Sequence, residues 1–242
     1  MKTCTIMIKF LIYLHHLNPF LHKAEFLDEN NRSQERQALI NKMVPLWARQ
    51  SLEVTKSTVE TQGLENIPDE PVVFVGNHTS YADIVVLLGY LKEGEAVPLV
   101  GKAGLKKVPY IGRWMSVIHC VFLNRHNTRQ AVQNIKEAIS IIKGGQSLIV
   151  FPEGTRTKTG QLNPFLSGAF KIAQKSKVKV VPFCIKNANK INKPGSFSIK
   201  SAQVILKVLP PIDTTHYTVK EWRALPQLAE EQVRQGLASL TD

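Results

Sequence analysis

The chain has few cysteines, and none of them stands in a metal-binding spacing. Its 242 residues include Cys4, Cys120 and Cys184, widely separated and without a CxxC pair. This pattern argues against a zinc site or a disulfide framework and favours free thiols in a reducing compartment. Cys120 and Cys184 lie in apolar, strand-like segments, so we expect them to be small core residues. The chain also lacks a long low-complexity tract, and 43% of its residues are hydrophobic, which predicts a sizeable core.

Acidic residues are scarce relative to basic ones. The chain has 19 Asp and Glu against 31 Lys and Arg, a formal net charge of +12. A charge of this sign attracts an anionic partner, such as a phospholipid surface, a nucleic acid or an acidic carrier protein. The basic residues are spread along the chain, and no nucleic-acid-binding motif accompanies them. We therefore expect an anionic membrane surface as a partner and no nucleic acid.

The N-terminal region lacks an apolar run long enough to span a membrane. Residues 4–21 are mostly apolar but are interrupted by Lys9, His15, His16 and Pro19, whereas a spanning helix needs about 20 apolar residues. Lys9 and the absence of a small-residue cleavage site argue against a signal peptide. A helix in the membrane interface fits better, with an ordinary packed helix as the alternative. Residues 33–52 show a second helical pattern that Ser33 could cap, so residues 1–54 are predicted to be a two-helix membrane-associating segment.

Beyond residue 54, apolar strand-like runs alternate with helical patterns. We predict strands at 57–62, 72–76, 96–100, 120–123, 147–151, 178–185 and 204–209, and helices at 81–91, 128–143, 167–175 and 219–240. Strands separated by helices indicate an α/β fold. The expected architecture is a mixed, largely parallel sheet of about seven strands flanked by helices, occupying residues 55–242 after the N-terminal two-helix segment.

The first candidate site is a histidine and a carboxylate five positions apart. His78 directly follows the predicted strand 72–76, and Asp83 falls in the first turn of the next helix. A histidine can accept a proton from a bound hydroxyl, and a carboxylate can hold the other ring nitrogen. The alternative is structural, because Ser80 and Asp83 resemble a capping box in which Ser80 is the N-cap and Asp83 is N3.

The second candidate site follows another predicted strand. In the sequence Phe-Pro-Glu-Gly-Thr-Arg at 151–156, the proline ends the strand and Gly154 permits a positive φ. Arg156 can bind a phosphate with two N–H groups, and Glu153 can order the turn or contact substrate hydroxyls. A plain turn with a surface arginine is the alternative. Arg125 closes a further strand and could point into the same cleft, and Pro182 inside an apolar strand suggests an edge strand or a bend.

In this order, the segments resemble the motifs of the 1-acylglycerol-3-phosphate acyltransferase family. The segments that carry the resemblance are 77–83, 101–112, 122–125, 151–156, 164–169 and 181–182. Two positions depart from the family pattern. Asn124 stands where an aspartate is usual, and Leu166 stands where a lysine is frequent. The resemblance covers about residues 55–215.

The resemblance implies transfer of a fatty acyl chain from a thioester to the 2-hydroxyl of lysophosphatidic acid, giving phosphatidic acid. The donor would be the acyl thioester of acyl carrier protein (acyl-ACP) or of coenzyme A (acyl-CoA), with no bound cofactor and no metal. His78 would be the general base and Asp83 its orienting partner, and the implied substrate-binding residues are Lys102, Arg125, Glu153, Gly154, Thr155 and Arg156. The enzyme would lie on the cytoplasmic face of a membrane as a peripheral or monotopic protein. A sister acyltransferase acting on glycerol 3-phosphate, a lysophospholipid or a lyso-amino-lipid stays open, as does a non-catalytic lipid-binding protein.

Overall fold

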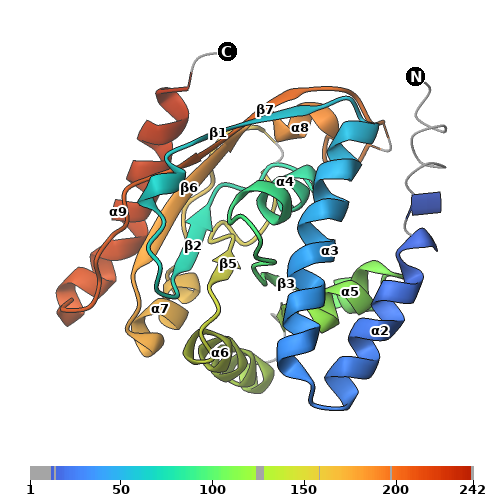
Figure 1. Ribbon diagram of the computed structural model, residues 1–242. Coiled ribbons are helices and arrows are strands. Elements are labelled where there is room, and N and C mark those ends of the chain that lie inside the picture. Colours follow the sequence, from blue (N-terminus) through green and yellow to red (C-terminus); the bar gives the residue numbers. More distant parts are fainter. Residues whose placement is uncertain (1–11, 14, 124–127, 158, 197, 241–242) are drawn as a thin grey trace.

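The computed structural model describes residues 12–240 apart from residues 14, 124–127, 158 and 197 (Figure 1). The strands in this part of the chain are β1 (Thr58–Gln62), β2 (Val73–Gly76), β3 (Val100–Lys102), β4 (Val121–Leu123), β5 (Leu148–Val150), β6 (Val180–Lys186) and β7 (Gln203–Val208). The α-helices are α2 (Asn18–Glu29), α3 (Ser33–Val54), α4 (Ala82–Tyr90), α5 (Ile111–Val117), α6 (Thr128–Lys143), α7 (Lys171–Ser176), α8 (Ala188–Ile191) and α9 (Val219–Ala238). Three short 3-10 helices complete the description: η1 (Leu64–Asn66), η2 (Ala103–Lys107) and η3 (Ser167–Phe170).

The strands form a five-stranded sheet in the order β1-β7-β6-β2-β5 and a separate pair, β3 and β4. All strand pairs are parallel except β6 with β7. An isolated bridge between Leu99 and Ile149 joins the small sheet to the large one. The predicted mixed, largely parallel α/β fold is confirmed, although its strands are divided between two sheets.

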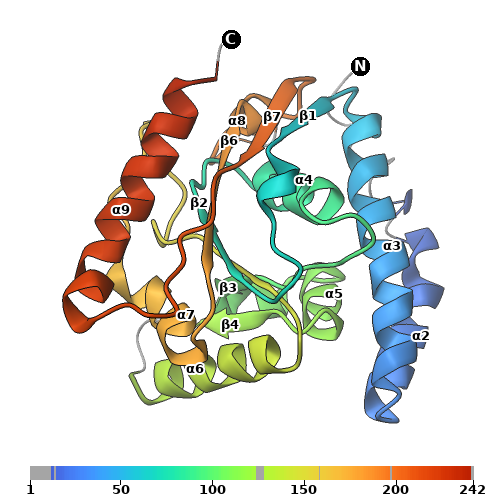
Figure 2. The ribbon, with the colours of Figure 1, turned by 60° about the vertical axis from the view of Figure 1, so that its left-hand side comes forward.

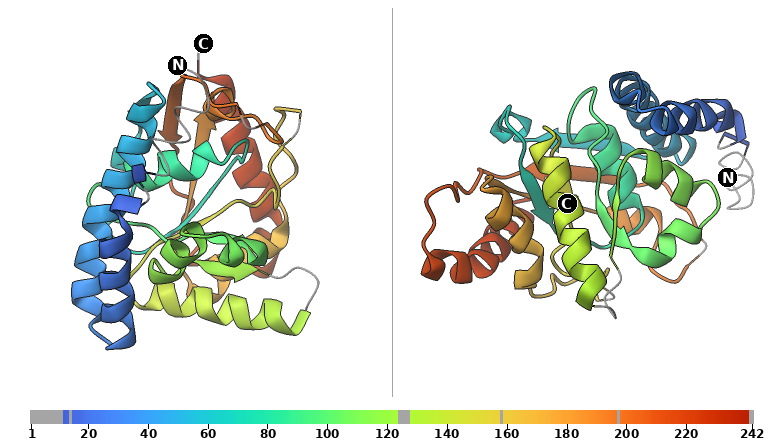
Figure 3. Two further views of the ribbon diagram at one scale, coloured as in Figure 1. Left: turned by 90° about the vertical axis from the view of Figure 1, so that its right-hand side faces the viewer. Right: turned by 90° about the horizontal axis from the view of Figure 1, so that it is seen from below.

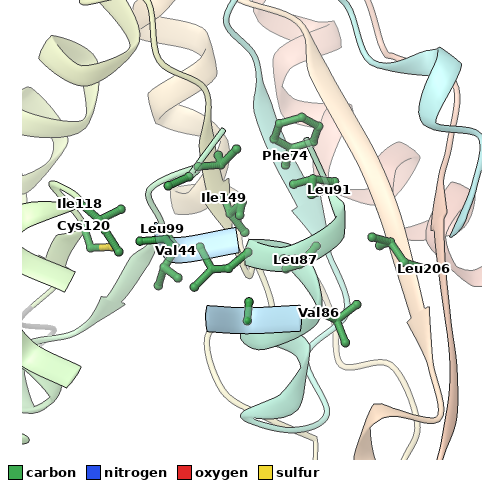
Figure 4. Close-up of a cluster of buried hydrophobic side chains, with 14 of the residues drawn as sticks. Val44, Phe74, Val86, Leu87, Leu91, Leu99, Ile118, Cys120, Ile149 and Leu206 are labelled. Atoms are coloured by element: carbon green, nitrogen blue, oxygen red, sulfur yellow. The ribbon is translucent and has the colours of Figure 1, made fainter. Parts of the chain in front are cut away.

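Helices cover both faces of the large sheet, which explains why its central strands are apolar on both sides (Figure 2). Along β2, Phe74 packs in a cluster with side chains of α3 and α4, while Val73 and Val75 pack in a second cluster with side chains of α6, α7 and α9. Figure 4 shows Phe74 and Ile149 from the sheet in one cluster with Val44 of α3. The alternation fixes the register of β2 between the two layers.

The helices α2 and α3 lie side by side along one edge of the molecule (Figure 3). The side chains of Val44, Ala48 and Leu52 on α3 belong to the same buried cluster as α4, so α3 is part of the central core. Arg113 of α5 donates two hydrogen bonds to Glu25 of α2, at 2.7 and 2.5 Å, which fastens the helix pair to the neighbouring layer. No helix among the described residues is long and apolar enough to cross a membrane.

The two predicted N-terminal helices differ in how far the structure describes them. The predicted helix over residues 33–52 is confirmed as α3, but Ser33 is its first residue and not its cap, because Arg32 occupies the N-cap and no side chain caps the helix end. Most of the apolar segment 4–21 lies outside the described residues, so its placement in a membrane interface stays a prediction, as does the division of the chain at residue 54.

Pro182 is not in an edge strand, contrary to one of the two readings of its position. It lies in β6, between β2 and β7 in the centre of the sheet. Its carbonyl oxygen accepts a hydrogen bond from Leu209, just beyond the end of β7. Since the N–H and C=O of one strand residue point the same way, the missing N–H faces this segment where regular pairing has ended. The sheet therefore loses no ladder hydrogen bond to β2.

Candidate active site

The two candidate motifs follow neighbouring parallel strands. His78 lies in the loop after β2, and the turn at 151–156 follows β5, which pairs with β2. Carboxyl ends of parallel strands meet at one edge of a sheet, where α/β proteins bind ligands. The amide of Asn77 donates to the carbonyl oxygen of Ile185 at 2.9 Å and accepts from its N–H at 2.8 Å. This buried side chain extends the pairing with β6 by one step and fixes the start of the His78 loop.

His78 and Asp83 are hydrogen-bonded. Nδ1 of His78 donates to Oδ2 of Asp83 at 2.8 Å, and the Asp83 side chain is fully buried. An ionised carboxylate only accepts hydrogen bonds, so Nδ1 carries a proton and Nε2 of the neutral ring is left as the basic nitrogen. The His78 side chain is 13% exposed and reaches the cavity described below.

The same carboxylate also organises the loop between β2 and α4. Oδ2 of Asp83 accepts hydrogen bonds from the N–H groups of Thr79 at 2.6 Å and Ser80 at 2.8 Å, and the Ser80 hydroxyl accepts from the N–H of Ala82 at 3.1 Å. The expected capping box is thus only partly formed, because Tyr81 and not Ser80 is the N-cap of α4, and the Ser80 hydroxyl accepts from the N–H of Ala82 and not from that of Asp83. The two interpretations of Asp83 are compatible, since one side chain holds both the imidazole and the loop backbone.

Glu153 joins the two motifs through the backbone. Its Oε1 accepts the N–H of His78 at 2.6 Å, and its Oε2 accepts the N–H of Asn163 at 2.8 Å. The side chain is 5% exposed, and this burial raises the pKa of the Glu153 carboxyl above its ordinary value, although the two backbone hydrogen bonds oppose the shift. A backbone hydrogen bond also joins the two loops, because the N–H of Thr157 donates to the carbonyl oxygen of His78 at 2.9 Å. The carboxylate of Glu153 therefore bonds to protein backbone on both sides.

One cavity of about 560 Å³ opens beside these loops. Five of the predicted site residues line it: His78, Lys102, Gly154, Thr155 and Arg156. Two further predicted residues, Asp83 and Glu153, lie buried beneath the cavity wall. Arg125 lies outside the described residues, so its role stays a prediction. The structure thus brings the imidazole and the Arg156 guanidinium to one shared space.

Tyr81 was not among the predicted site residues, yet its ring contacts the arginine of the second motif. The guanidinium carbon of Arg156 lies 3.8 Å from the centre of the Tyr81 ring. Such a cation–π contact orients the planar guanidinium while leaving its N–H groups in the plane available to a ligand. Tyr81 and Arg156 are far apart in sequence and belong to different motifs, so no local pattern could have predicted the pair.

A second, apolar pocket of about 380 Å³ adjoins the cavity. The two spaces share Tyr81, Ile84, Leu99 and Leu105 as wall residues. The other side chains that line the second pocket are apolar and belong to α3, to α4 and to residues 108–120. They include Met43, Trp47, Trp114 and Cys120. An elongated apolar ligand could extend from the polar cavity into this pocket.

The two cysteines among the described residues take no part in this site's chemistry. Cys120 and Cys184 are free and buried, and burial raises the pKa of each thiol to about 12. A thiol with so high a pKa holds almost no thiolate, so neither is a nucleophile. Among the residues that the structure describes, no group of three His, Cys, Asp or Glu side chains could hold a metal ion.

Comparisons with known proteins agree with this geometry. The family model described as Acyltransferase matches residues 58–186. The chain is 42% identical to the chloroplastic 1-acyl-sn-glycerol-3-phosphate acyltransferase BAT2 of Brassica napus over 156 residues, 64% of this chain and 44% of that protein. It is 32% identical to the 1-acyl-sn-glycerol-3-phosphate acyltransferase of Saccharomyces cerevisiae over 163 residues, 66% of this chain and 53% of that protein. The chain therefore spans about half the length of these curated relatives.

A solved structure extends the likeness to nearly the whole chain. The 1-acyl-sn-glycerophosphate (LPA) acyltransferase PlsC from Thermotoga maritima superimposes with a TM-score of 0.78 at 26% identity and covers 97% of both chains. The family match includes both loops that bound the cavity, and the structural match includes the N-terminal helix pair. On these grounds, the chain belongs to the acyltransferase family.

Proposed function

We propose that the protein transfers a fatty acyl chain from a thioester to the 2-hydroxyl of 1-acyl-sn-glycerol 3-phosphate and so makes phosphatidic acid. The observation that carries this proposal is the His78–Asp83 hydrogen bond at 2.8 Å, beside a cavity that also receives Arg156. The named activities of the relatives from Brassica napus, Saccharomyces cerevisiae and Thermotoga maritima support it.

In the proposed reaction, His78 is the general base. Nε2 takes the proton of the acceptor hydroxyl while the hydroxyl oxygen forms a bond to the thioester carbonyl carbon. The carbon–sulfur bond then breaks, and the departing sulfur takes the proton from the imidazolium and leaves as a thiol. Asp83 keeps Nδ1 protonated and stabilises the positive charge that the ring carries between these steps.

The phosphate of the acceptor would be bound by cationic side chains of the cavity. Arg156 is oriented by Tyr81, and Lys102 of the strand β3 also lines the cavity. Gly154, with φ of 71°, and Thr155 would shape the same wall beside Arg156. Glu153 acts through its hydrogen bonds to the backbone of His78 and Asn163, and the predicted second phosphate ligand is Arg125.

An apolar pocket next to the cavity supports a lipid substrate. The second pocket adds about 380 Å³ of apolar space, and it shares Tyr81, Ile84, Leu99 and Leu105 with the cavity as wall residues. A free glycerol phosphate would leave this space empty, whereas an acyl chain would fill it and gain hydrophobic stabilisation. This favours an acylated acceptor or donor chain lying there.

The distribution of charge supports an anionic donor and an anionic membrane as partners. Residues 96–180 contain 14 of the 31 basic residues but only 2 of the 19 acidic residues, so the other parts of the chain hold 17 of each sign. The whole net charge thus arises in the segment that forms most of the cavity wall. Acyl-carrier protein and acyl-coenzyme A are both anionic and both fit this field.

We further propose that the protein attaches to the cytoplasmic face of a membrane through its N-terminal helix pair. On α2, Phe20 is 40% exposed and Phe26 is 54% exposed, and Leu46 on α3 is 42% exposed. Exposed aromatic and aliphatic side chains on a helix that lies along the edge of the molecule suit insertion into the headgroup region.

An acceptor panel tests the proposal. Purified protein is supplied with a labelled acyl thioester of coenzyme A or of acyl carrier protein as the donor. Four acceptors are assayed one at a time: 1-acyl-sn-glycerol 3-phosphate, glycerol 3-phosphate, a lysophospholipid and a lyso-amino-lipid. We expect 1-acyl-sn-glycerol 3-phosphate to give the highest kcat/KM, with labelled phosphatidic acid as product and His78→Ala as the inactive control. Higher kcat/KM on another acceptor would assign the sister activity, and binding without turnover on any acceptor would identify a lipid-binding protein.

A further inference from the structure

The imidazole of His78 lies flat on an aromatic ring. The ring of Phe151, the first residue after β5, is 4.0 Å from the imidazole centre to centre, and the two planes differ by only 17°. The hydrogen bond to Asp83 fixes one edge of the imidazole but leaves the ring able to tilt about that bond. A face-to-face contact with Phe151 removes this freedom, because tilting would bring the imidazole edge into the phenyl face.

The Phe151 ring in turn packs against a second phenylalanine ring. Its ring meets the edge of the Phe183 ring at a centre-to-centre distance of 6.1 Å and an angle of 81°, a T-shaped contact. Phe183 lies in β6 and is fully buried, so its ring has a fixed position. The strand that carries Pro182 therefore reaches the imidazole through two aromatic rings in series, Phe183 and Phe151.

A glycine makes room for this support. The last residue of β2, Gly76, pairs with Phe183 in the register of the sheet. A Cβ atom added to Gly76 would lie 2.4 Å from the Phe183 ring, closer than real Cβ contacts allow. Any larger residue at position 76 would push the Phe183 ring, and with it the Phe151 ring that the imidazole rests on.

We propose that Phe151 is a positioning residue that sets the plane of the His78 imidazole, with Phe183 and Gly76 as its support; this rests on the proposed role of His78 as the base. The arrangement links three adjacent strands, β5, β2 and β6 (Figure 1). Asp83 then anchors the imidazole at Nδ1, and Phe151 fixes the direction in which Nε2 points.

Kinetics of three variants at position 151 test the proposal. Phe151→Leu and Phe151→Met remove the ring, and we expect kcat to fall about 10- to 100-fold because a displacement of about 1 Å at the reacting atoms can cost about 10²-fold. KM for the acceptor should stay within about 3-fold, and Phe151→Tyr should restore kcat. Phe170→Leu is the matched control, since Phe170 is buried in another aromatic contact, with Phe165, and does not line the cavity.

A spectroscopic measurement separates this proposal from the proposed reaction. In protein with isotope-labelled histidine, the His78 ring protons are assigned as those that disappear in His78→Gln. We expect an upfield ring-current shift in the wild type and in Phe151→Tyr, and its loss in Phe151→Leu and Phe151→Met, whether or not an acceptor is turned over. An unchanged His78 shift in both ring-less variants, or full kcat in either of them, would overturn the proposal. Inactivity of the wild type on every acceptor would instead count against the proposed function.

Discussion

Replacing Asp83 by asparagine tests the charge of the catalytic pair with little change in shape. Oδ2 of Asp83 accepts three hydrogen bonds, from His78, Thr79 and Ser80, whereas Oδ1 accepts only the hydroxyl of Thr79 at 3.2 Å. An asparagine can place its oxygen at the Oδ2 position and its amide nitrogen beside that hydroxyl, which can also accept. The hydrogen-bond count and the proton on Nδ1 are then preserved, and only the negative charge is lost.

The expected loss of rate follows from the distance. With 2.8 Å between Nδ1 and Oδ2, the charge centres of the imidazolium and the carboxylate lie about 4 Å apart, which at an effective dielectric constant of about 20 corresponds to about 4 kcal/mol. This energy acts only when the ring is charged, as it is near the transition state. We therefore expect kcat of Asp83→Asn to fall about 10³-fold.

The measurement is initial-rate acyl transfer to 1-acyl-sn-glycerol 3-phosphate, together with thermal unfolding of the same samples. Asp213→Asn is the matched control, because Asp213 also accepts a backbone N–H, from Thr215 at 3.0 Å, but is exposed and does not line the cavity. The kcat of Asp213→Asn should equal that of the wild type. If Asp83→Asn lowers Tm but keeps kcat within about 3-fold of the wild type, Asp83 serves the loop alone and the catalytic assignment fails.

Four further results are expected. His78→Ala should lose about 10²-fold or more in kcat while keeping the wild-type circular dichroism spectrum, and unchanged turnover would reject the base. Arg156→Lys should raise KM for the acceptor about 10-fold with a smaller effect on kcat, since lysine cannot bind phosphate in a bidentate manner; an unaltered KM would remove Arg156 from the phosphate site. Burial raises the pKa of Glu153 in the folded protein, so the carboxyl adds stability while it is protonated and loses that contribution as pH rises through the folded pKa. The stability advantage of the wild type over Glu153→Gln in denaturant titrations should therefore shrink as pH rises above the ordinary pKa of a glutamate; a pH-independent difference would contradict this. Replacing Phe20 and Phe26 together by aspartate should weaken co-sedimentation with anionic vesicles at unchanged Tm, whereas full binding would exclude α2 as the anchor.

Local pattern was sufficient to predict most of the fold. Apolar runs bounded by Gly, Pro or polar residues identified all seven strands within a few residues, and the helix at 128–143 was predicted with its observed limits. The least accurate strand prediction was 96–100, because the pairing of β3 begins only at Val100 and the preceding residues form a single bridge from Leu99 to Ile149. The sequence cannot separate an apolar extended segment from a paired one.

Elements that depend on distant contacts could not be predicted. The helix α5 was missed because it has only seven residues and is held by Arg113 against Glu25 of α2, a partner far away in sequence. The site shows the same division. The His78–Asp83 pair is local and was predicted, whereas the contacts of Phe151 with His78 and of Tyr81 with Arg156 join loops about 70 residues apart or more. Glu153 was singled out, but only the fold shows that both its oxygens bond to backbone.

The packing of α3 against α4 limits how the protein can be shortened. Gly89 lets the two helices approach so closely that a Cβ there would lie 3.3 Å from Ala48, and Arg49 donates a hydrogen bond to the Gly89 carbonyl at 2.8 Å. A polypeptide starting at residue 55 would expose the α4 side chains that α3 now covers, each worth about 1.5–3 kcal/mol. It would also remove the α3 side chains that line the apolar pocket, among them Met43 and Trp47. The N-terminal helices are therefore expected to be inseparable from the rest of the fold, and removing them should yield aggregates and not a smaller enzyme.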